Sequence, residues 1–180
     1  MAQRIEVITW EQLQRDIFRL GEKIMESGFK PEVIVAIARG GWVVGRILSD
    51  ILGVKKVAGI TIKFYKAVEK REKEPEIYQS LNIDVKGKRV LLVDDIVDTG
   101  KTLSKALQHV KERHAIVKTA TPYVKPHTEM WPDYYVRVVD KWVVFPYEYF
   151  ETLEDLGHDE SVRETLNASI GIKDTAKQGD

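Results

Sequence analysis

Two adjacent carboxylates, Asp94 and Asp95, follow the apolar run Val90–Val93 in a chain of 180 residues. A short loop rich in small and hydroxyl side chains comes next and ends in Asp98-Thr99-Gly100-Lys101-Thr102. From Leu103, apolar residues recur at i, i+3, i+4 and i+7, which predicts a helix. Backbone amides of such a loop and the helix N-terminus bind phosphate. The acids can contact hydroxyl groups or a metal, so we predict a phosphate site beside an acidic pair.

Two other interpretations of this stretch explain it less well. In an ordinary strand-loop-helix corner, Asp98 or Thr99 would only cap the helix. Such a corner gains nothing from two adjacent carboxylates, which repel each other. A nucleotide-hydrolysing P-loop needs a glycine five residues before the Gly100-Lys101 pair, and position 95 carries aspartate instead.

The stretch resembles the ribose-phosphate signature of the type I phosphoribosyltransferases: an apolar strand, Asp-Asp, two apolar residues and Asp-Thr-Gly-x-Thr. The resemblance implies that Asp94 and Asp95 meet the ribose of 5-phosphoribosyl 1-diphosphate (PRPP), with Asp95 nearest to a substrate-bound magnesium ion (Mg2+). Asp98 would lie near N7 of the base and accept its proton as general base. The residues implied to bind the 5′-phosphate are Thr99, Gly100, Lys101 and Thr102.

A second corner of the same kind begins at Val33–Ala38, an unbroken apolar run typical of a strand covered on both faces. It ends in Arg39-Gly40-Gly41, and a further helical stripe follows. Glycines expose backbone amides and Arg39 can pair with an anion, which indicates a second phosphate site. A tight turn with a solvated arginine is the alternative. The segment resembles the family's pyrophosphate loop, so Arg39 and Gly40 are implied to bind PRPP.

Later residues match the family's base-binding positions. Lys125 follows a strand candidate at Ala115–Thr121 and stands where purine-using members have a lysine that donates to the 6-oxo group. Trp142 and Val143 match the stacking aromatic and the residue whose backbone meets the purine edge, in a segment similar to xanthine-guanine and hypoxanthine-guanine enzymes. Taken alone, a lysine there more often faces solvent and such a tryptophan is more often core. Glu148 falls where the family has an aspartate near Mg2+.

The remaining elements position these residues. A capping box at Thr9–Gln12 and an apolar stripe predict a packing helix as far as Gly28. Val57–Ile62 is a further strand candidate, Tyr134–Val139 is interpreted as the last strand, and a short helix is expected from Glu148 to Leu156. Strands alternating with helices predict an α/β fold with an open, mostly parallel twisted sheet flanked by helices. The resemblance adds the type I phosphoribosyltransferase fold with a small hood.

The charged segment from Lys63 to Lys73 lacks an apolar period. A solvated surface hairpin is one interpretation. The resemblance implies instead a mobile loop that closes over the active site, with Lys66 or Arg71 touching pyrophosphate. We expect residues 1–156 to form a single phosphoribosyltransferase domain. The polar tail 157–180 is expected to be loose or to form a subunit contact.

Composition narrows the class of protein. Lys+Arg and Asp+Glu balance at 28 each, so no bulk charge favours nucleic acid or an anionic membrane. The chain has no cysteine, hence no disulfide framework, and its histidines (109, 114, 127 and 158) lack metal-ligand spacing. Neither a signal-peptide core nor a run of membrane-spanning length occurs. A cytoplasmic, single-domain protein is expected.

The resemblance implies transfer of a 5-phosphoribosyl group from PRPP to a 6-oxopurine in purine salvage, giving the nucleoside monophosphate and pyrophosphate, with Mg2+. The sequence does not rank guanine, hypoxanthine and xanthine as acceptors, although Val144 and Phe145 stand where xanthine-guanine enzymes carry polar residues, which counts against xanthine. Family members are usually dimers or tetramers, so a homodimer or homotetramer is expected. One alternative is a non-catalytic PRPP-sensing regulator, but the chain lacks a basic DNA-binding helix. Another is an enzyme that uses adenine or a pyrimidine, against which Lys125 and Trp142 count.

Overall fold

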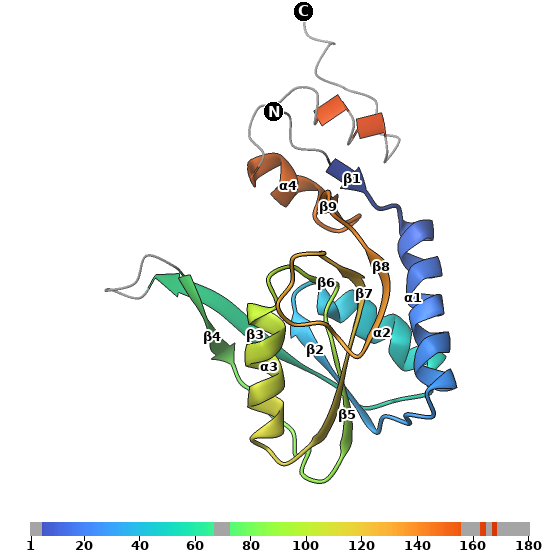
Figure 1. The fold of residues 1–180 in the computed structure, drawn as a ribbon, viewed down its shortest axis with the longest axis vertical. Coiled ribbons are helices and arrows are strands. Elements are labelled where there is room, and N and C mark those ends of the chain that lie inside the picture. The colour runs from blue at the N-terminus through green and yellow to red at the C-terminus, as the bar shows by residue number, and fades with distance from the viewer. Residues whose placement is uncertain (1–4, 67–72, 156–162, 165–166, 169–180) are drawn as a thin grey trace, which may run out of the picture. The chain divides into compact units, whose positions relative to one another are not determined.

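The computed structural model describes residues 5–66, 73–155, 163–164 and 167–168 (Figure 1). By its contacts the chain divides into two compact units. The smaller unit comprises Met1–Leu13 and Val139–Asp180, and the larger unit comprises Gln14–Val138. The expected tail at 157–180 falls almost entirely outside the described residues.

The larger unit contains a seven-stranded sheet in the order β4-β3-β2-β5-β7-β6, with β8 paired to β7. Every neighbouring pair is parallel except β3 and β4. Helix α1 (Trp10–Glu26) enters this unit from the smaller one. The strands are β2 (Val33–Ala38), β3 (Val57–Lys66), β4 (Lys73–Gln79), β5 (Arg89–Val93), β6 (Ile96–Val97), β7 (Ile116–Val124) and β8 (Tyr134–Val138), and the other helices are α2 (Gly41–Ile51) and α3 (Lys101–Lys111). The predicted α/β class with a mostly parallel sheet is confirmed.

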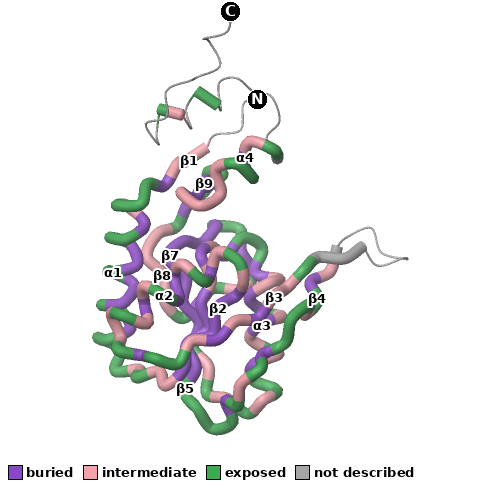
Figure 2. Tube along the Cα trace, turned by 180° about the vertical axis from the view of Figure 1, so that it is seen from behind, coloured by how far each residue is buried: buried purple, intermediate pink, exposed green. Residues whose placement is uncertain are grey.

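The two central strands, β2 and β5, are buried along nearly their whole length (Figure 2). Side chains of Val33–Ile37 and Val90–Val93 are at most 2% exposed. Each fully buried Val, Leu or Ile contributes about 1.5–3 kcal/mol, so these runs fix the centre of the sheet. Polar chemistry is therefore possible only where the strands end.

A buried polar contact joins α1 to β7 within the larger unit. The hydroxyl of Tyr123 donates to Oδ2 of Asp16 at 2.8 Å, and both side chains are fully buried. Arg137 and Arg19 approach the same carboxylate at 3.8 and 3.7 Å. Burial and the bond to Asp16 raise the pKa of the Tyr123 hydroxyl well above its usual value. The contact fixes the helix against the sheet.

The smaller unit contains a parallel pair of short strands, β1 (Ile5–Val7) and β9 (Trp142–Val144), and helix α4 (Tyr149–Asp155). The ring of Phe145 stacks on that of Tyr147 with 5.3 Å between centroids. The expectation that Tyr134–Val139 is the last strand is wrong, because β9 follows it. Three residues are too short for a period, and pairing with β1 defines this strand. The short helix expected from Glu148 is present as α4.

The charged segment after Val57–Ile62 begins as a continuation of β3. This strand extends to Lys66 and pairs antiparallel with β4 from Lys73, as in a hairpin. The ammonium group of Lys63 lies 3.5 Å from the centre of the Tyr78 ring. The side chains of Lys66 and Arg71, expected at pyrophosphate, lie outside the part of the chain that is described.

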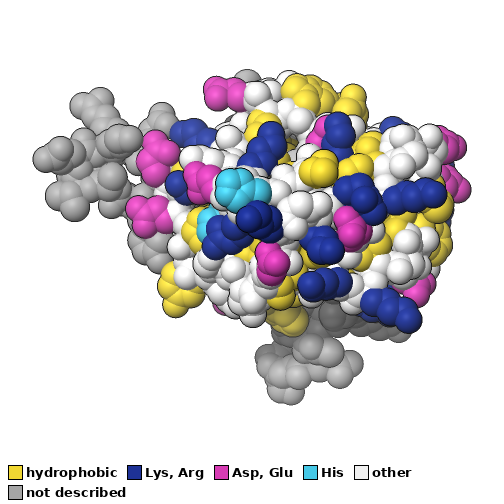
Figure 3. All heavy atoms as spheres, turned by 90° about the horizontal axis from the view of Figure 1, so that it is seen from below, with side chains coloured by type: hydrophobic (Ala, Val, Ile, Leu, Met, Phe, Trp, Pro, Cys, Tyr) yellow, Lys and Arg dark blue, Asp and Glu magenta, His cyan; other side chains and the backbone are white. Residues whose placement is uncertain are grey.

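Charges of both signs are interspersed on the face shown in Figure 3, with no large patch of one sign. No helix among the described residues is long and apolar enough to cross a bilayer.

Candidate active site

The first predicted corner, residues 94–102, connects β5 to α3. Helix α3 is capped by Gly100, whose φ is +89° and which makes no side-chain cap bond. A Cβ on Gly100 would lie 2.7 Å from Cβ of Met130, so both the backbone and the space require glycine. The N-cap residue is therefore neither Asp98 nor Thr99, although the hydroxyl of Thr99 accepts the backbone N–H of Lys101 at 3.4 Å. The N-terminal amides of α3 face the loop, where an anion can bind.

The two carboxylates of this corner have different environments. Asp95 is 7% exposed, and its Oδ1 accepts the backbone N–H of Ile96 at 2.8 Å. Asp94 is half-buried, and its Oδ1 accepts the backbone N–H of Asp95 at 3.0 Å. Backbone bonds thus orient both side chains, and Asp94 is the more accessible of the two.

The second corner, residues 38–41, packs directly on the first. Strands β2 and β5 are parallel neighbours with Ala36 opposite Val93, so their carboxyl ends meet at one edge of the sheet. A Cβ on Gly40 would lie 1.7 Å from Oδ2 of Asp95, and one on Gly41 would lie 2.7 Å from the carbonyl oxygen of Val93. The peptide bond before Arg39 is cis. The structure therefore brings the two predicted phosphate corners into contact.

A cleft of about 540 Å³ opens beside the first corner. Lys101 and Lys105 lie one helical turn apart along it. Their positive charges and the N-terminus of α3 both favour a bound anion at this end of the helix. The sequence analysis did not select Lys105 as a site residue, although its spacing of four residues from Lys101 could have indicated that both lie on one face of the helix. The lining residues are Glu74, Pro75, Glu76, Thr99, Gly100, Lys101, Ser104, Lys105, Gln108, Glu129 and Met130.

The loop between β7 and β8, residues 125–133, lies along the first corner. The backbone N–H of Lys125 donates to the carbonyl of Val97 at 2.8 Å, and that of Glu129 donates to the carbonyl of Thr99 at 3.2 Å. Lys125 is only 9% exposed, so it is not the solvent-facing lysine that its sequence alone favours. The predicted base-contacting lysine is thereby placed next to the predicted phosphate loop.

The same loop carries a residue that the sequence did not single out. Nε2 of His127 lies 2.7 Å from Oδ1 of Asp98, the predicted general base. The two side chains are 60% and 66% exposed, respectively. A histidine without metal-ligand spacing is ordinarily a surface residue, and only its position two residues after Lys125 could have pointed to it.

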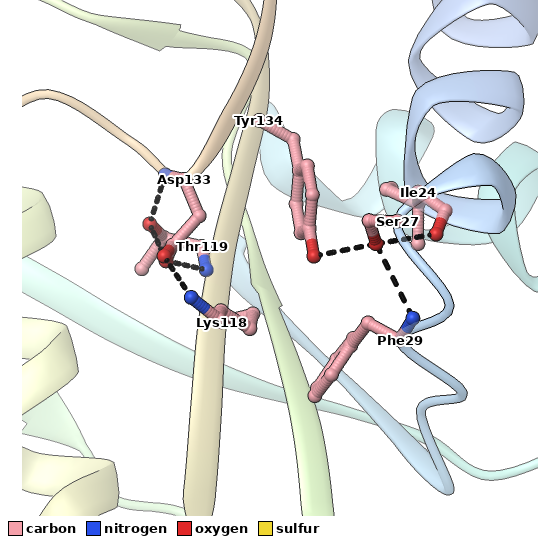
Figure 4. Close-up of polar contacts among 7 residues, drawn as sticks. All are labelled: Ile24, Ser27, Phe29, Lys118, Thr119, Asp133 and Tyr134. Atoms are coloured by element: carbon pink, nitrogen blue, oxygen red, sulfur yellow. Dashed lines mark hydrogen bonds and ion pairs between the residues drawn. The ribbon is translucent and has the colours of Figure 1, made fainter.

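The far end of the 125–133 loop is fixed on β7 (Figure 4). Asp133 accepts bonds from the ammonium of Lys118 at 2.7 Å and from the backbone and hydroxyl of Thr119 at 2.8 and 2.9 Å. Burial acts to raise the pKa of the Asp133 carboxyl, but these bonds outweigh burial and hold the pKa below its usual value. The hydroxyl of Tyr134 lies 2.8 Å from that of Ser27, at the end of α1. Both ends of the loop are therefore tied to secondary structure.

The remaining predicted residues belong to the smaller unit. Trp142 on β9 is 42% exposed, so it is not a core residue, whereas Val143 is buried. Glu148 is half-buried and directly precedes α4. The structure groups these three residues in one unit, and it groups Arg39, Asp94–Thr102 and Lys125 in the other.

The side-chain oxygens of the site suit a magnesium ion that is held mainly by a bound substrate. Within the described residues, no group of three or more His, Asp or Glu side chains could hold a metal ion. Mg2+ is commonly bound by one or two carboxylates together with substrate phosphates rather than by a cage of protein ligands. Asp95, at the carboxyl end of β5, is a carboxylate that can serve in this way.

Comparison with known proteins identifies the family. The family model described as the phosphoribosyl transferase domain matches residues 7–152. The chain belongs to this phosphoribosyltransferase family. The match covers both corners, Lys125 and the Trp142–Glu148 segment, so the predicted family and fold class are confirmed.

Two curated relatives of this phosphoribosyltransferase are named xanthine-guanine phosphoribosyltransferase. The protein from Gluconobacter oxydans is 32% identical over 143 residues, covering 78% of this chain and 83% of its own. The one from Chromohalobacter salexigens is 33% identical over 154 residues, covering 82% and 89%. A solved purine phosphoribosyltransferase from Pyrococcus horikoshii is 43% identical, with a TM-score of 0.73 and coverage of 79% and 93%. A Helicobacter pylori structure, 22% identical with a TM-score of 0.71, covers 84% and 99% and supports the fold alone.

Proposed function

We propose that this phosphoribosyltransferase transfers the 5-phosphoribosyl group of PRPP to a 6-oxopurine, releasing pyrophosphate, as a step of purine salvage. The observation that carries the proposal is the packing of Gly40 against Asp95. It makes one site of two phosphate corners, which suits a substrate phosphorylated at both ends. The purine acceptor is supported by the names of the relatives from Gluconobacter oxydans and Pyrococcus horikoshii.

In the proposed reaction, N9 of the purine attacks C1′ of PRPP. The N9–C1′ bond forms, the bond from C1′ to pyrophosphate oxygen breaks, and pyrophosphate leaves with the electron pair. The proton on N7 of the base passes to the carboxylate of Asp98. Catalysis rests on holding the two substrates in line and on stabilising the departing anion.

In the proposal, the two corners bind different parts of PRPP. Arg39 and the backbone at Gly40 hold pyrophosphate, Asp94 and Asp95 accept the ribose hydroxyls, and residues 99–102 hold the 5′-phosphate. The N-terminal amides of α3 and the nearby Lys101 support this assignment. A guanidinium and an N-terminal helix end both favour bound phosphate.

On the acceptor side, Lys125 donates to the 6-oxo group, Trp142 stacks on the purine and the backbone of Val143 meets its edge. An ammonium has three donors and no acceptor, so it suits an oxo group and not an amino group. The exposed indole of Trp142 supports a stacking role. The acceptors to be compared are therefore the 6-oxopurines guanine, hypoxanthine and xanthine.

Bound with PRPP, Mg2+ would neutralise the charge of the diphosphate. Asp95 and Glu148 are the carboxylates we assign to it. The bond that Oδ1 of Asp95 accepts from the backbone N–H of Ile96 orients this carboxylate, and Mg2+ is commonly bound by one or two carboxylates together with substrate phosphates. We further propose that the enzyme works as a homodimer or homotetramer in the cytoplasm.

A pyrophosphate-release assay with PRPP and Mg2+ tests the function, run separately with guanine, hypoxanthine, xanthine, adenine and uracil. We expect turnover with at least one 6-oxopurine, and the relative rates name the substrate. Release with adenine or uracil alone would retain the donor site and overturn the roles of Lys125 and Trp142. Absence of turnover, with PRPP binding still visible by calorimetry, would favour a PRPP-sensing regulator.

A further inference from the structure

We propose that His127 is a positioning residue that holds the carboxylate of Asp98 by one oxygen, so that the other oxygen faces the N7 proton of the purine. This inference rests on the proposed function, because Asp98 needs an orientation only if it accepts that proton. His127 itself touches neither substrate in the proposal. It acts through Asp98.

The geometry shows how one oxygen is occupied. Nε2 of His127 lies 2.7 Å from Oδ1 of Asp98, which is the length of a strong hydrogen bond to a carboxylate. Within the described part of the chain, neither side chain makes another hydrogen bond or ion pair. Oδ2 of Asp98 is therefore the oxygen left to accept a proton.

The exposure of Asp98 explains why a partner is needed. Its side chain is 66% exposed, and an exposed carboxylate with no neighbour rotates among several rotamers. A general base must lie within hydrogen-bond reach of the proton it accepts. A donor fixed on one side of the carboxylate restricts it to one orientation before the purine arrives, as the third member of a nucleophile–base–orienter set does.

His127 can fix Asp98 because its own backbone is fixed. The backbone N–H of Lys125 bonds to Val97, and that of Glu129 bonds to Thr99, so bonds on either side of His127 reach residues on either side of Asp98. The N–H of Thr128 closes a turn onto the carbonyl of Lys125 at 3.2 Å. His127 is thus presented from a short turn clamped to the segment that it orients.

The proposal assigns the donor role in this contact to His127 and the acceptor role to Asp98. A neutral imidazole that donates from Nε2 keeps Nδ1 as an acceptor. An ionised carboxylate has two acceptor oxygens, so Asp98 can accept this bond at Oδ1 and the N7 proton at Oδ2. After transfer the proton resides on Asp98, and His127 keeps its own, so the histidine is not part of the proton path.

The test compares His127→Ala, His127→Gln and, as a control, His109→Ala, whose imidazole contacts Ser80 and Arg113 and not Asp98. Steady-state kinetics are measured with PRPP and the best 6-oxopurine, and thermal melting checks folding. We expect His127→Ala to lower kcat about tenfold, the loss of one hydrogen bond to a charged group, with KM for PRPP unchanged. Glutamine, whose amide can donate from a similar position, should restore most of kcat, and His109→Ala should retain it.

A double-mutant cycle separates positioning from general structural support. In an Asp98→Asn background no carboxylate remains to be oriented, so His127→Ala should cause no further loss of kcat. The inference is overturned if His127→Ala keeps full kcat, if KM for PRPP rises in step with the loss, or if the same extra loss persists in the Asp98→Asn background. A wild-type protein without turnover overturns the proposed function first, which is a separate result.

Discussion

Oδ2 of Asp95 lies where a side chain on residue 40 would begin: a Cβ added to Gly40 would be 1.7 Å from it. The φ of Gly40 is −59°, a value that any residue adopts. The requirement for glycine here is therefore one of space and not of backbone conformation. The close approach is what joins the 38–41 corner to the acidic pair.

Replacement of this glycine should uncouple the corners. Gly40→Ala must push the Asp95 carboxylate away, and since Asp95 is only 7% exposed it has little room to move. We expect the affinity for PRPP, measured by calorimetry with Mg2+, to fall at least about tenfold, equivalent to about 1.4 kcal/mol. Gly87→Ala is the control, because Gly87 has a φ of +69° and no atoms near its Cβ position. It should cost about 1 kcal/mol of stability without weakening PRPP binding. Unchanged binding by Gly40→Ala would contradict the proposed coupling.

The substitution Asp98→Asn should lower kcat without weakening the binding of PRPP. The amide keeps the size of the carboxylate but does not accept the N7 proton, and general bases typically contribute about 10²- to 10⁴-fold. We expect kcat to fall within that range while PRPP affinity stays within about twofold, a difference of less than about 0.5 kcal/mol. Kinetics and calorimetry on the same preparation check both values. Near-wild-type turnover would remove the role of general base.

The sequence predicted those elements whose pattern is local. The apolar runs of β2 and β5 were recognised because strands covered on both faces carry almost no polar residues. Helix α3 was recognised from its buried stripe of Leu103, Ala106 and Val110. Both corners were located for the same reason, since they directly follow these strands in the chain.

Features that depend on distant partners could not be predicted. Strand β4 (Lys73–Gln79) is mostly polar and exists because β3 pairs with it, and β9 pairs with β1 from the opposite end of the chain. The contact between His127 and Asp98 depends on the parallel pairing of β6 with β7, which brings the residues after both strands together. The distances that define the site arise from the sheet order, which no single segment encodes.

The acceptor preference should depend on the donor-only character of Lys125. Lys125→Gln introduces an amide that can both donate and accept, so an amino group at C6 becomes acceptable. We expect the ratio of kcat/KM for guanine over adenine to fall about tenfold or more. Lys86→Gln, at an exposed lysine before β5, should leave the ratio unchanged. An unchanged ratio in Lys125→Gln would show that residues other than Lys125 select the 6-oxo group.

The hydroxyl of Tyr123 should make the free energy of unfolding depend on pH in the alkaline range. Tyr123→Phe removes the donor that bonds to the buried carboxylate of Asp16. The cost near neutral pH should be about 1–3 kcal/mol, measured by urea denaturation, because a buried carboxylate loses one of its hydrogen-bond donors.

The difference in stability between wild type and Tyr123→Phe, followed as a function of pH, has a predictable sign. Burial and the Asp16 bond raise the pKa of folded Tyr123, whereas an unfolded tyrosine ionises near pH 10. The contribution is therefore fully present below about pH 10 and is lost as pH rises further, since only the unfolded chain then releases this proton. We expect the stability advantage of wild type over Tyr123→Phe to be constant up to about pH 9 and to shrink towards about pH 11. An advantage that stays constant across this range would show that the folded and unfolded hydroxyls ionise alike.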